Sequence, residues 1–80
     1  MIKENTMEKV VEILSGIKSG VDFNTAERIV TDKILDSIDI TTLIAQIESE
    51  FDIEIGMEYM ENENFDSARA IWEMIQEILE

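Results

Sequence analysis

Three residue types are missing from this chain of 80 residues, which has no cysteine, no histidine and no proline. Without cysteine there is no disulfide, and without cysteine or histidine a structural zinc site lacks its usual ligands. Apolar runs are also short, because none approaches the roughly 20 residues that span a bilayer. The N-terminus, residues 1–5, shows no charged region followed by an apolar stretch, so no secretory signal is visible. We therefore expect a cytoplasmic protein with no metal site and no membrane insertion.

Positive charge is scarce, with 6 lysine and arginine residues against 19 aspartate and glutamate residues and a formal net charge of −13. The window from Ile34 to Ala68 has no basic residue and ten acidic ones. We expect no nucleic-acid binding, because counterion release depends on basic side chains. An anionic membrane surface would also repel the chain. The window is expected to attract basic partners, unless its charge serves solubility alone.

The length and the hydrophobic content of 45% predict one domain, residues 1–80, with one small core. We also expect a monomer. Helical spacing predicts a first helix from a capping box at Asn5–Glu8 to about Lys18 and a second from Asp36 to Phe51. A short helix is expected at residues 57–60, and a last helix is expected after Asp66 as its cap. The fold class is all-α, a small four-helix bundle with three main helices, one short helix and a long loop after the first helix.

Each predicted element has a set of apolar residues expected to face the core. In the long loop and the link after the second helix these are Phe23, Ile29, Val30, Ile34, Leu35, Ile53 and Ile55. In the helices they are Met7, Val10, Val11, Leu14 and Ile17, then Ile40, Leu43, Ile44, Ile47 and Phe51, then Ala68, Ile71, Trp72, Ile75, Ile78 and Leu79. Residues 62–64 are expected to form a turn.

The head of the second helix is the most informative segment of the chain. Asp36 is a suitable N-cap, which places Ser37 at the first helical position, and Asp39 in the first turn suits the helix dipole. A phosphate attached to Ser37 would face free backbone N–H groups and the positive end of that dipole. Ser37 is therefore the candidate residue for a covalent, phosphate-linked group, although serine is also common at helix starts without any such role.

In this context the motif Asp36-Ser37-Ile38 resembles that of the acyl carrier protein family, and the segment Glu48–Ile55 is similar to the end of the family's second helix. The resemblance covers nearly the full length, including the long loop and the short third helix. It implies that Ser37, flanked by Asp36 and Ile38, holds 4′-phosphopantetheine as a phosphodiester. The arm would come from coenzyme A through a phosphopantetheinyl transferase, and its thiol would hold an acyl or aminoacyl group as a thioester.

The sequence departs from the family's commonest pattern at two places. Lys33-Ile34-Leu35 stands where many fatty-acid carriers have Leu-Gly-Ala, and Thr41 and Thr42 replace the usual glutamate. These features are closer to D-alanine carriers and other stand-alone carriers. By resemblance, an acyl cargo would enter between the second and later helices, with walls formed by Leu43, Ile44, Ile47, Ile53, Ile55, Ile71 and Ile75. An aminoacyl cargo would gain nothing there, because burying its ammonium group without a partner is costly. Only shallow sequestration is expected.

The side of the second helix opposite its buried stripe is the expected partner face. Loading and transferring enzymes with basic surfaces would meet it at Ile38, Asp39, Ala45 and Glu48, and a change at Glu48 should alter stability little. No nucleophile–base pair is present, so the chain is expected not to be an enzyme. The alternative is a non-carrier acidic helical protein that binds a basic partner, which explains the charge but not the motif.

Overall fold

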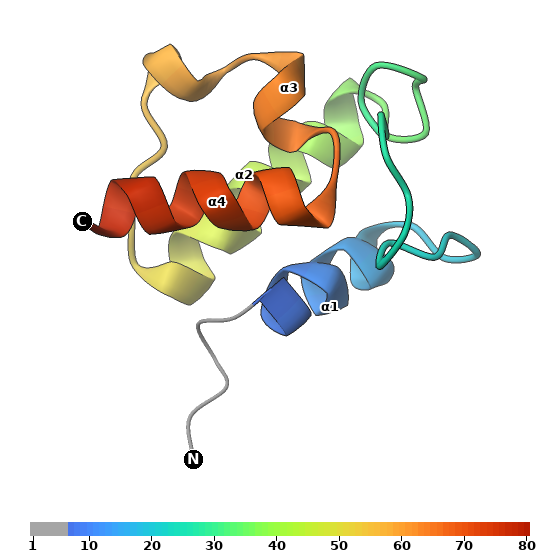
Figure 1. Ribbon diagram of the computed structural model, residues 1–80, viewed down its shortest axis with the longest axis horizontal. Coiled ribbons are helices and arrows are strands. Elements are labelled where there is room, and N and C mark those ends of the chain that lie inside the picture. Colours follow the sequence, from blue (N-terminus) through green and yellow to red (C-terminus); the bar gives the residue numbers. More distant parts are fainter. Residues whose placement is uncertain (1–6) are drawn as a thin grey trace.

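The computed structural model describes residues 7–80, which form an all-α fold (Figure 1). Within this range there is no β-strand, and the helices are α1 (Met7–Ile17), α2 (Ser37–Phe51), the 3-10 helix η1 (Met57–Tyr59), α3 (Asn62–Phe65) and α4 (Ala68–Leu79). The predicted small bundle, with three main helices, one short helix and a long loop after the first, is confirmed. The predicted cap at Asn5 lies outside the described residues.

The short α-helix lies later in the chain than the sequence predicts. Residues 57–60 form only the 3-10 turn η1, and residues 62–64, predicted as a turn, belong to α3. Phe65 explains the difference, because its buried ring anchors the end of α3 in the core. The side-chain amide of Asn64 also donates a hydrogen bond to the carbonyl of Tyr59 at 2.9 Å, which ties α3 to η1.

The main contacts between helices involve α1 and α4. α1 contacts both α2 and α4, and α3 packs on α4. In Figure 1, α4 crosses in front of α2, α1 lies on one side of this pair and α3 on the other. The loop between α1 and α2 runs along one edge of the bundle and delivers the chain to the start of α2. None of the helices within residues 7–80 is long and apolar enough to cross a lipid bilayer.

The core draws on every α-helix and on the loops. Most of the predicted core positions are buried or half-buried, including Phe23, Ile29 and Leu35 of the long loop. The fully packed set is Val10, Ile13, Leu14, Phe23, Ile29, Leu35, Leu43, Ile47, Phe51, Ile55, Phe65, Ala68, Ile71, Met74 and Ile75. The long loop is therefore part of the hydrophobic core and not an excursion into solvent.

Leu79 was predicted to face inward, but its side chain is 47% exposed. At 100° per residue, Leu79 lies at the edge of the stripe defined by Ile71 and Ile75. Met74 lies on the other edge of the same stripe and is buried. The buried stripe of α4 is therefore centred closer to Met74 than the sequence predicts. The predicted stripe included Trp72 and Leu79 and left Met74 out.

Candidate functional site

The start of α2 is closed by a reciprocal capping box. The Oδ1 atom of Asp36 accepts a hydrogen bond from the N–H of Asp39 at 2.8 Å, and Oδ2 of Asp39 accepts one from the N–H of Asp36 at 3.3 Å. Asp36 has extended backbone angles, as an N-cap requires. This confirms the predicted N-cap at Asp36, the first helical position at Ser37 and the place of Asp39 in the first turn.

Ser37 is exposed at the first position of a capped helix. The first four N–H groups of a helix have no partner inside it. Here these are the groups of residues 36–39, because the N–H of Ile40 already donates to the carbonyl of Asp36. The capping box occupies those of Asp36 and Asp39, which leaves those of Ser37 and Ile38. A phosphate on the serine would lie beside these two groups. The capping carboxylates already compensate much of the dipole, so the helix start offers a modest attraction for an anion.

The chain reaches Ser37 through a loop held by backbone hydrogen bonds, one to the segment between α3 and α4 and one within the loop. The N–H of Ile29 donates to the carbonyl of Asp66 at 2.8 Å, and the N–H of Leu35 donates to the carbonyl of Ile29 at 2.9 Å. Arg28 and Lys33 both have a positive φ, at 59° and 63°, in the left-handed region that non-glycine residues seldom occupy. These contacts fix the approach to α2 against local backbone strain.

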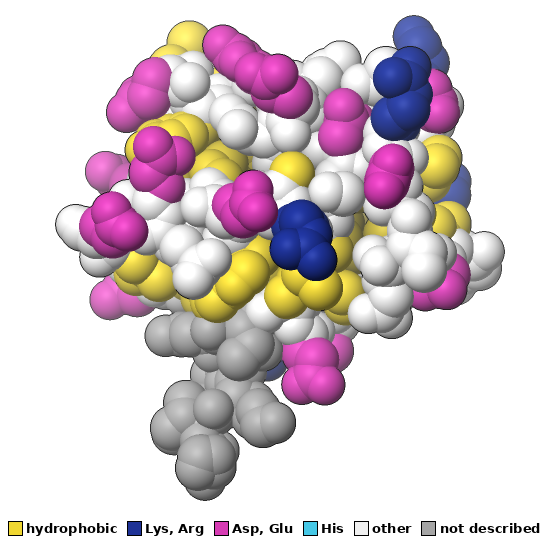
Figure 2. All heavy atoms as spheres, in the orientation of Figure 1, with side chains coloured by type: hydrophobic (Ala, Val, Ile, Leu, Met, Phe, Trp, Pro, Cys, Tyr) yellow, Lys and Arg dark blue, Asp and Glu magenta, His cyan; other side chains and the backbone are white. Residues whose placement is uncertain are grey.

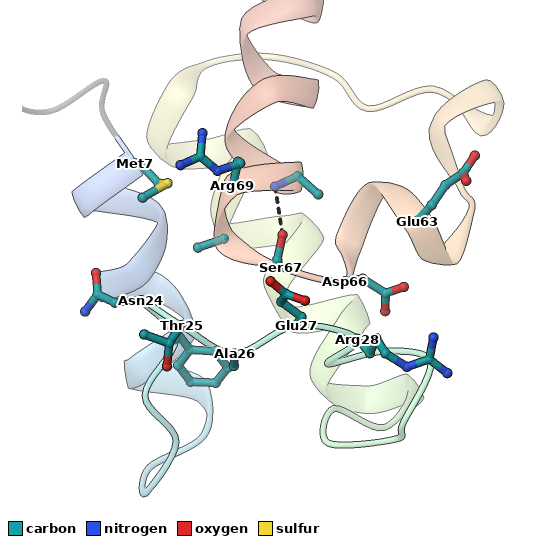
Figure 3. A pocket seen from close by; sticks show the side chains of 13 residues that line it. Met7, Asn24, Thr25, Ala26, Glu27, Arg28, Glu63, Asp66, Ser67 and Arg69 are labelled. Carbon is teal, nitrogen blue, oxygen red and sulfur yellow. Dashed lines mark hydrogen bonds between the residues drawn. The ribbon is translucent and has the colours of Figure 1, made fainter.

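Asp66 does not cap α4, as the sequence had suggested. The cap is Ser67, whose Oγ accepts a hydrogen bond from the N–H of Ala70 at 3.0 Å (Figure 3). The carboxylate of Asp66 turns instead to the long loop, where Oδ1 accepts from the N–H groups of Val30 at 3.0 Å and Thr31 at 2.8 Å. Its Oδ2 accepts from the hydroxyl of Thr31 at 2.7 Å. The sequence analysis did not predict these hydrogen bonds between Asp66 and Thr31, because no local motif indicates them.

The pKa of Asp66 lies below its ordinary value of 3.8. Burial, the largest single influence, raises the pKa, but the hydrogen bonds from Thr31 and Val30 and the charge of Arg28 together outweigh it. The ionised form is thus the one that the folded protein favours. Stability from Asp66 is present above pH 3.8 and is lost as the pH falls through the lowered pKa.

The predicted partner residues do not share one environment. Ile38 is 74% exposed and Ala45 is exposed on the same face, while Asp39 and Glu48 are half-buried. Asp39 is engaged in the capping box. Glu48 uses Oε2 to accept a hydrogen bond from the N–H of Ile55 at 2.9 Å, which fastens the link after α2. The outer face of α2 is therefore apolar and neutral near Ile38, with little free charge.

The hydrogen bond of Glu48 changes the expectation for its substitution. Glu48→Lys should lower the free energy of unfolding by about 1–3 kcal/mol, because the N–H of Ile55 loses a charged acceptor. Glu48→Gln retains an acceptor oxygen and should cost less. Urea titration monitored by Trp72 fluorescence would compare the two variants, and equal stabilities of Glu48→Lys and the unsubstituted chain would show that solvent replaces the bond.

Most acidic side chains of the window that make no structural hydrogen bond follow α2 in the chain. Glu50 pairs with Lys9 of α1 at 3.1 Å, so one of the window's carboxylates has a cation from outside the window. The exposed remainder forms what we call the acidic segment, residues 52–63, with Asp52, Glu54, Glu58, Glu61 and Glu63. Figure 2 shows acidic side chains scattered across one face of the molecule among far fewer basic ones.

This distribution predicts how stability responds to salt and pH. Sodium chloride or millimolar magnesium should raise the melting temperature by screening repulsion within the acidic segment. Mild acidification should act in the same direction, but below pH 3.8 the loss of the Asp66 carboxylate reverses the trend. Arg28, Glu27, Glu63 and Arg69 line the hollow that Asp66 borders, so their charges contribute to this response. Melting curves between pH 7 and 2 that fall without a maximum would contradict the prediction.

Two hollows lie near this region. A small pocket of about 130 Å³ is lined by Val30, Ile40, Met60, Glu61, Asn62 and Phe65. Ile40 is three residues after Ser37, so this pocket borders the first turn of α2. The predicted cargo walls Leu43, Ile47, Ile71 and Ile75 have no exposed surface and pack against the core.

The larger hollow, about 330 Å³, lies between residues 23–28 and the start of α4 (Figure 3). Its lining mixes Glu27, Glu63 and Asp66 with Arg28 and Arg69. Figure 3 shows the two arginine side chains pointing to different sides. Because its cations do not converge, this hollow is not arranged to bind one anion.

Comparison of the chain with models of protein families, with curated proteins and with solved structures gave no match. The features that bear on function are therefore the motif at residues 36–38 and the surroundings of Ser37. Among residues 7–80 there is no cluster of three or more carboxylate side chains arranged to hold a metal ion.

Proposed function

We propose that this chain is a carrier protein that holds an acyl or aminoacyl intermediate as a thioester on a 4′-phosphopantetheine arm attached to Ser37. The observation that supports this best is an exposed serine hydroxyl at the first position of a capped helix, at the end of a loop bound into the core. An ordinary helix-start serine does not need such a loop. In this proposal the protein is a substrate and shuttle for enzymes.

Attachment of the arm requires only a positioned hydroxyl from the carrier. Oγ of Ser37 would attack the β-phosphorus of the pyrophosphate in coenzyme A, and the bond from that phosphorus to the bridging oxygen would break. Adenosine 3′,5′-bisphosphate would leave, and a base on the transferase would take the serine proton. A metal ion on the transferase would stabilise the leaving charge.

The dimensions of the pocket favour a small cargo. A cavity of about 150 Å³ holds one benzene-sized molecule, and the pocket beside Ile40 is slightly smaller, at about 130 Å³. A short acyl group would fit there, and an aminoacyl group would stay outside because its ammonium group would lose hydration without gaining a partner. We therefore propose shallow or absent sequestration of the cargo, with specialised acyl or aminoacyl transfer favoured over bulk fatty-acid synthesis.

Partner enzymes would contact two adjoining kinds of surface. The neutral face of α2 offers Ile38 and Ala45 close to the arm, and the acidic segment offers carboxylates for basic side chains. A large exposed apolar side chain next to Ser37 is suited to burial in an interface. We propose that the transferase and the loading enzymes use Ile38 for affinity and the acidic segment for rapid association.

The exposed acidic segment also supports a second candidate, a non-carrier helical protein that binds a basic partner. The two candidates differ in what happens at Ser37. Intact mass spectrometry after incubation with coenzyme A and a broad-specificity phosphopantetheinyl transferase should show the mass of one arm on nearly every chain. If several such transferases leave the mass unchanged while they modify a known carrier in the same tube, the second candidate is favoured.

A further inference from the structure

The carboxylate of Asp66 joins the segment between α3 and α4 to the long loop, across 35 and 36 positions of the sequence. It accepts three hydrogen bonds, from the N–H groups of Val30 and Thr31 and from the Thr31 hydroxyl, at 2.7–3.0 Å. The backbone carbonyl of Asp66 accepts a fourth hydrogen bond, from the N–H of Ile29 at 2.8 Å. Both carboxylate oxygens and the backbone of one residue thus hold one turn of the loop, which we call the Ile29–Thr31 turn.

The Ile29–Thr31 turn is connected to Ser37 by a short series of contacts. The carbonyl of Ile29 accepts a hydrogen bond from the N–H of Leu35 at 2.9 Å, and Leu35 is buried. Asp36 follows directly and caps α2. A movement of the Ile29–Thr31 turn would therefore reach Ser37 through one hydrogen bond and two residues of chain.

The same turn shapes the pocket next to Ser37. Val30 lines that pocket from the loop and Phe65 lines it from α3. Val30 directly precedes Thr31 in the chain, and Phe65 directly precedes Asp66. The hydrogen bonds between Thr31 and Asp66 therefore hold two walls of the pocket at a fixed separation.

Backbone strain shows why the turn needs an outside partner. Arg28 and Lys33, on either side of it, have left-handed backbone angles. Such conformations persist in non-glycine residues only where surrounding contacts over-determine them. Within the loop, the N–H of Asp32 donates to the carbonyl of Arg28 at 2.8 Å, and the side-chain ion pair of these two residues at 3.4 Å is exposed and weak. The bonds from Asp66 add the contact from outside the loop.

We infer that Asp66 is a positioning residue for Ser37: it clamps the Ile29–Thr31 turn and so fixes the approach to α2 at which the arm is attached. This inference rests on the proposed function for its consequence in arm transfer. The clamp itself is a property of the apo chain and is tested without any transferase.

The first measurement is amide hydrogen exchange, followed by NMR on the apo chain. Asp66→Ala removes the acceptors of the clamp, and Thr31→Val removes only the hydroxyl bond with little change of shape. We expect exchange at Leu35 to accelerate at least about tenfold in Asp66→Ala and to a smaller degree in Thr31→Val. The N–H of Ile71, which bonds to the carbonyl of Ser67 in α4, is the internal reference for global opening.

The matched variants are Asp66→Asn and Asp32→Asn. Asp66→Asn retains an acceptor oxygen for the two backbone N–H groups, so it should restore slow exchange at Leu35. Asp32→Asn changes an exposed carboxylate one residue beyond Thr31 and should leave Leu35 unaffected. Equal acceleration at Leu35 and Ile71 in both Asp66→Ala and Thr31→Val would overturn the clamp and show general destabilisation instead.

The second measurement is the rate of arm transfer from coenzyme A by one phosphopantetheinyl transferase. Misplacement of a reacting group by a fraction of an ångström lowers reaction rates steeply, so kcat/KM should fall about tenfold in Asp66→Ala and recover in Asp66→Asn. If transfer is unchanged while Leu35 exchange is faster, the clamp does not position Ser37 for transfer and the inference is wrong. If the unsubstituted chain accepts no arm, the proposed function fails, and the exchange data decide the clamp separately.

Discussion

Ser37→Ala should abolish attachment of phosphopantetheine and leave the fold unchanged. The substitution removes the acceptor hydroxyl, so no other side chain in the motif can take the arm. Alanine is well tolerated at the first helical position, and Ser37 contributes to the fold mainly through its carbonyl, which accepts from the Thr41 hydroxyl at 2.9 Å. The free energy of unfolding should therefore change by less than about 0.5 kcal/mol.

The matched control is Ser49→Ala, an exposed serine on the same helix. It should be modified as fully as the unsubstituted chain. Intact mass spectrometry gives the extent of modification, and far-UV circular dichroism with urea titration gives the fold and its stability. An arm that persists in Ser37→Ala would place the attachment elsewhere and remove the main support for a carrier.

The second large effect is expected at Ile29, in the middle of the long loop. Its side chain has no exposed surface, so Ile29→Ala should leave a cavity and cost about 2–5 kcal/mol. At roughly 0.05–0.15 kcal/mol per residue, a chain of this length has only about 4–12 kcal/mol of total stability. A large part of the total free energy of unfolding would thus depend on one loop residue.

Ile38→Ala is the control for this prediction, because it makes the same change at an isoleucine that is 74% exposed. Its cost should stay below about 0.5 kcal/mol. Urea denaturation with a constant m-value would give both differences. A cost below about 1 kcal/mol for Ile29→Ala would mean that the loop can leave the core with little loss.

Local rules predicted the elements that depend on near neighbours. The cap at Asp36, the stripe of α2 through Leu43 and Ile47, and the burial of Ile29 all follow from spacing or from side-chain chemistry within a few residues. Asp66 shows the limit of this reasoning. It stands where an N-cap is expected, but adjacent Ser67 takes that task and frees the carboxylate for the loop.

The role of Glu48 was missed for a related reason. Its position on the helical wheel indicated solvent, and nothing in the sequence says that the chain folds back to bring the N–H of Ile55 to its carboxylate. The left-handed residue Asp52 makes this return possible by ending α2 with a sharp turn. Hydrogen bonds across such turns depend on the path of the backbone, which residue types alone do not specify.

The clamp between Thr31 and Asp66 has a consequence for the order of folding. It joins residues 35 positions apart, and closing so long a stretch of chain costs entropy that is recovered only when the flanking helices are already in place. The helices should consequently assemble first, with the loop settling onto them in the last step. In a freshly synthesised chain, the hydroxyl of Ser37 would then be exposed before the loop has packed onto the helices. Only after the loop has packed would Ser37 be held in the position that modification requires.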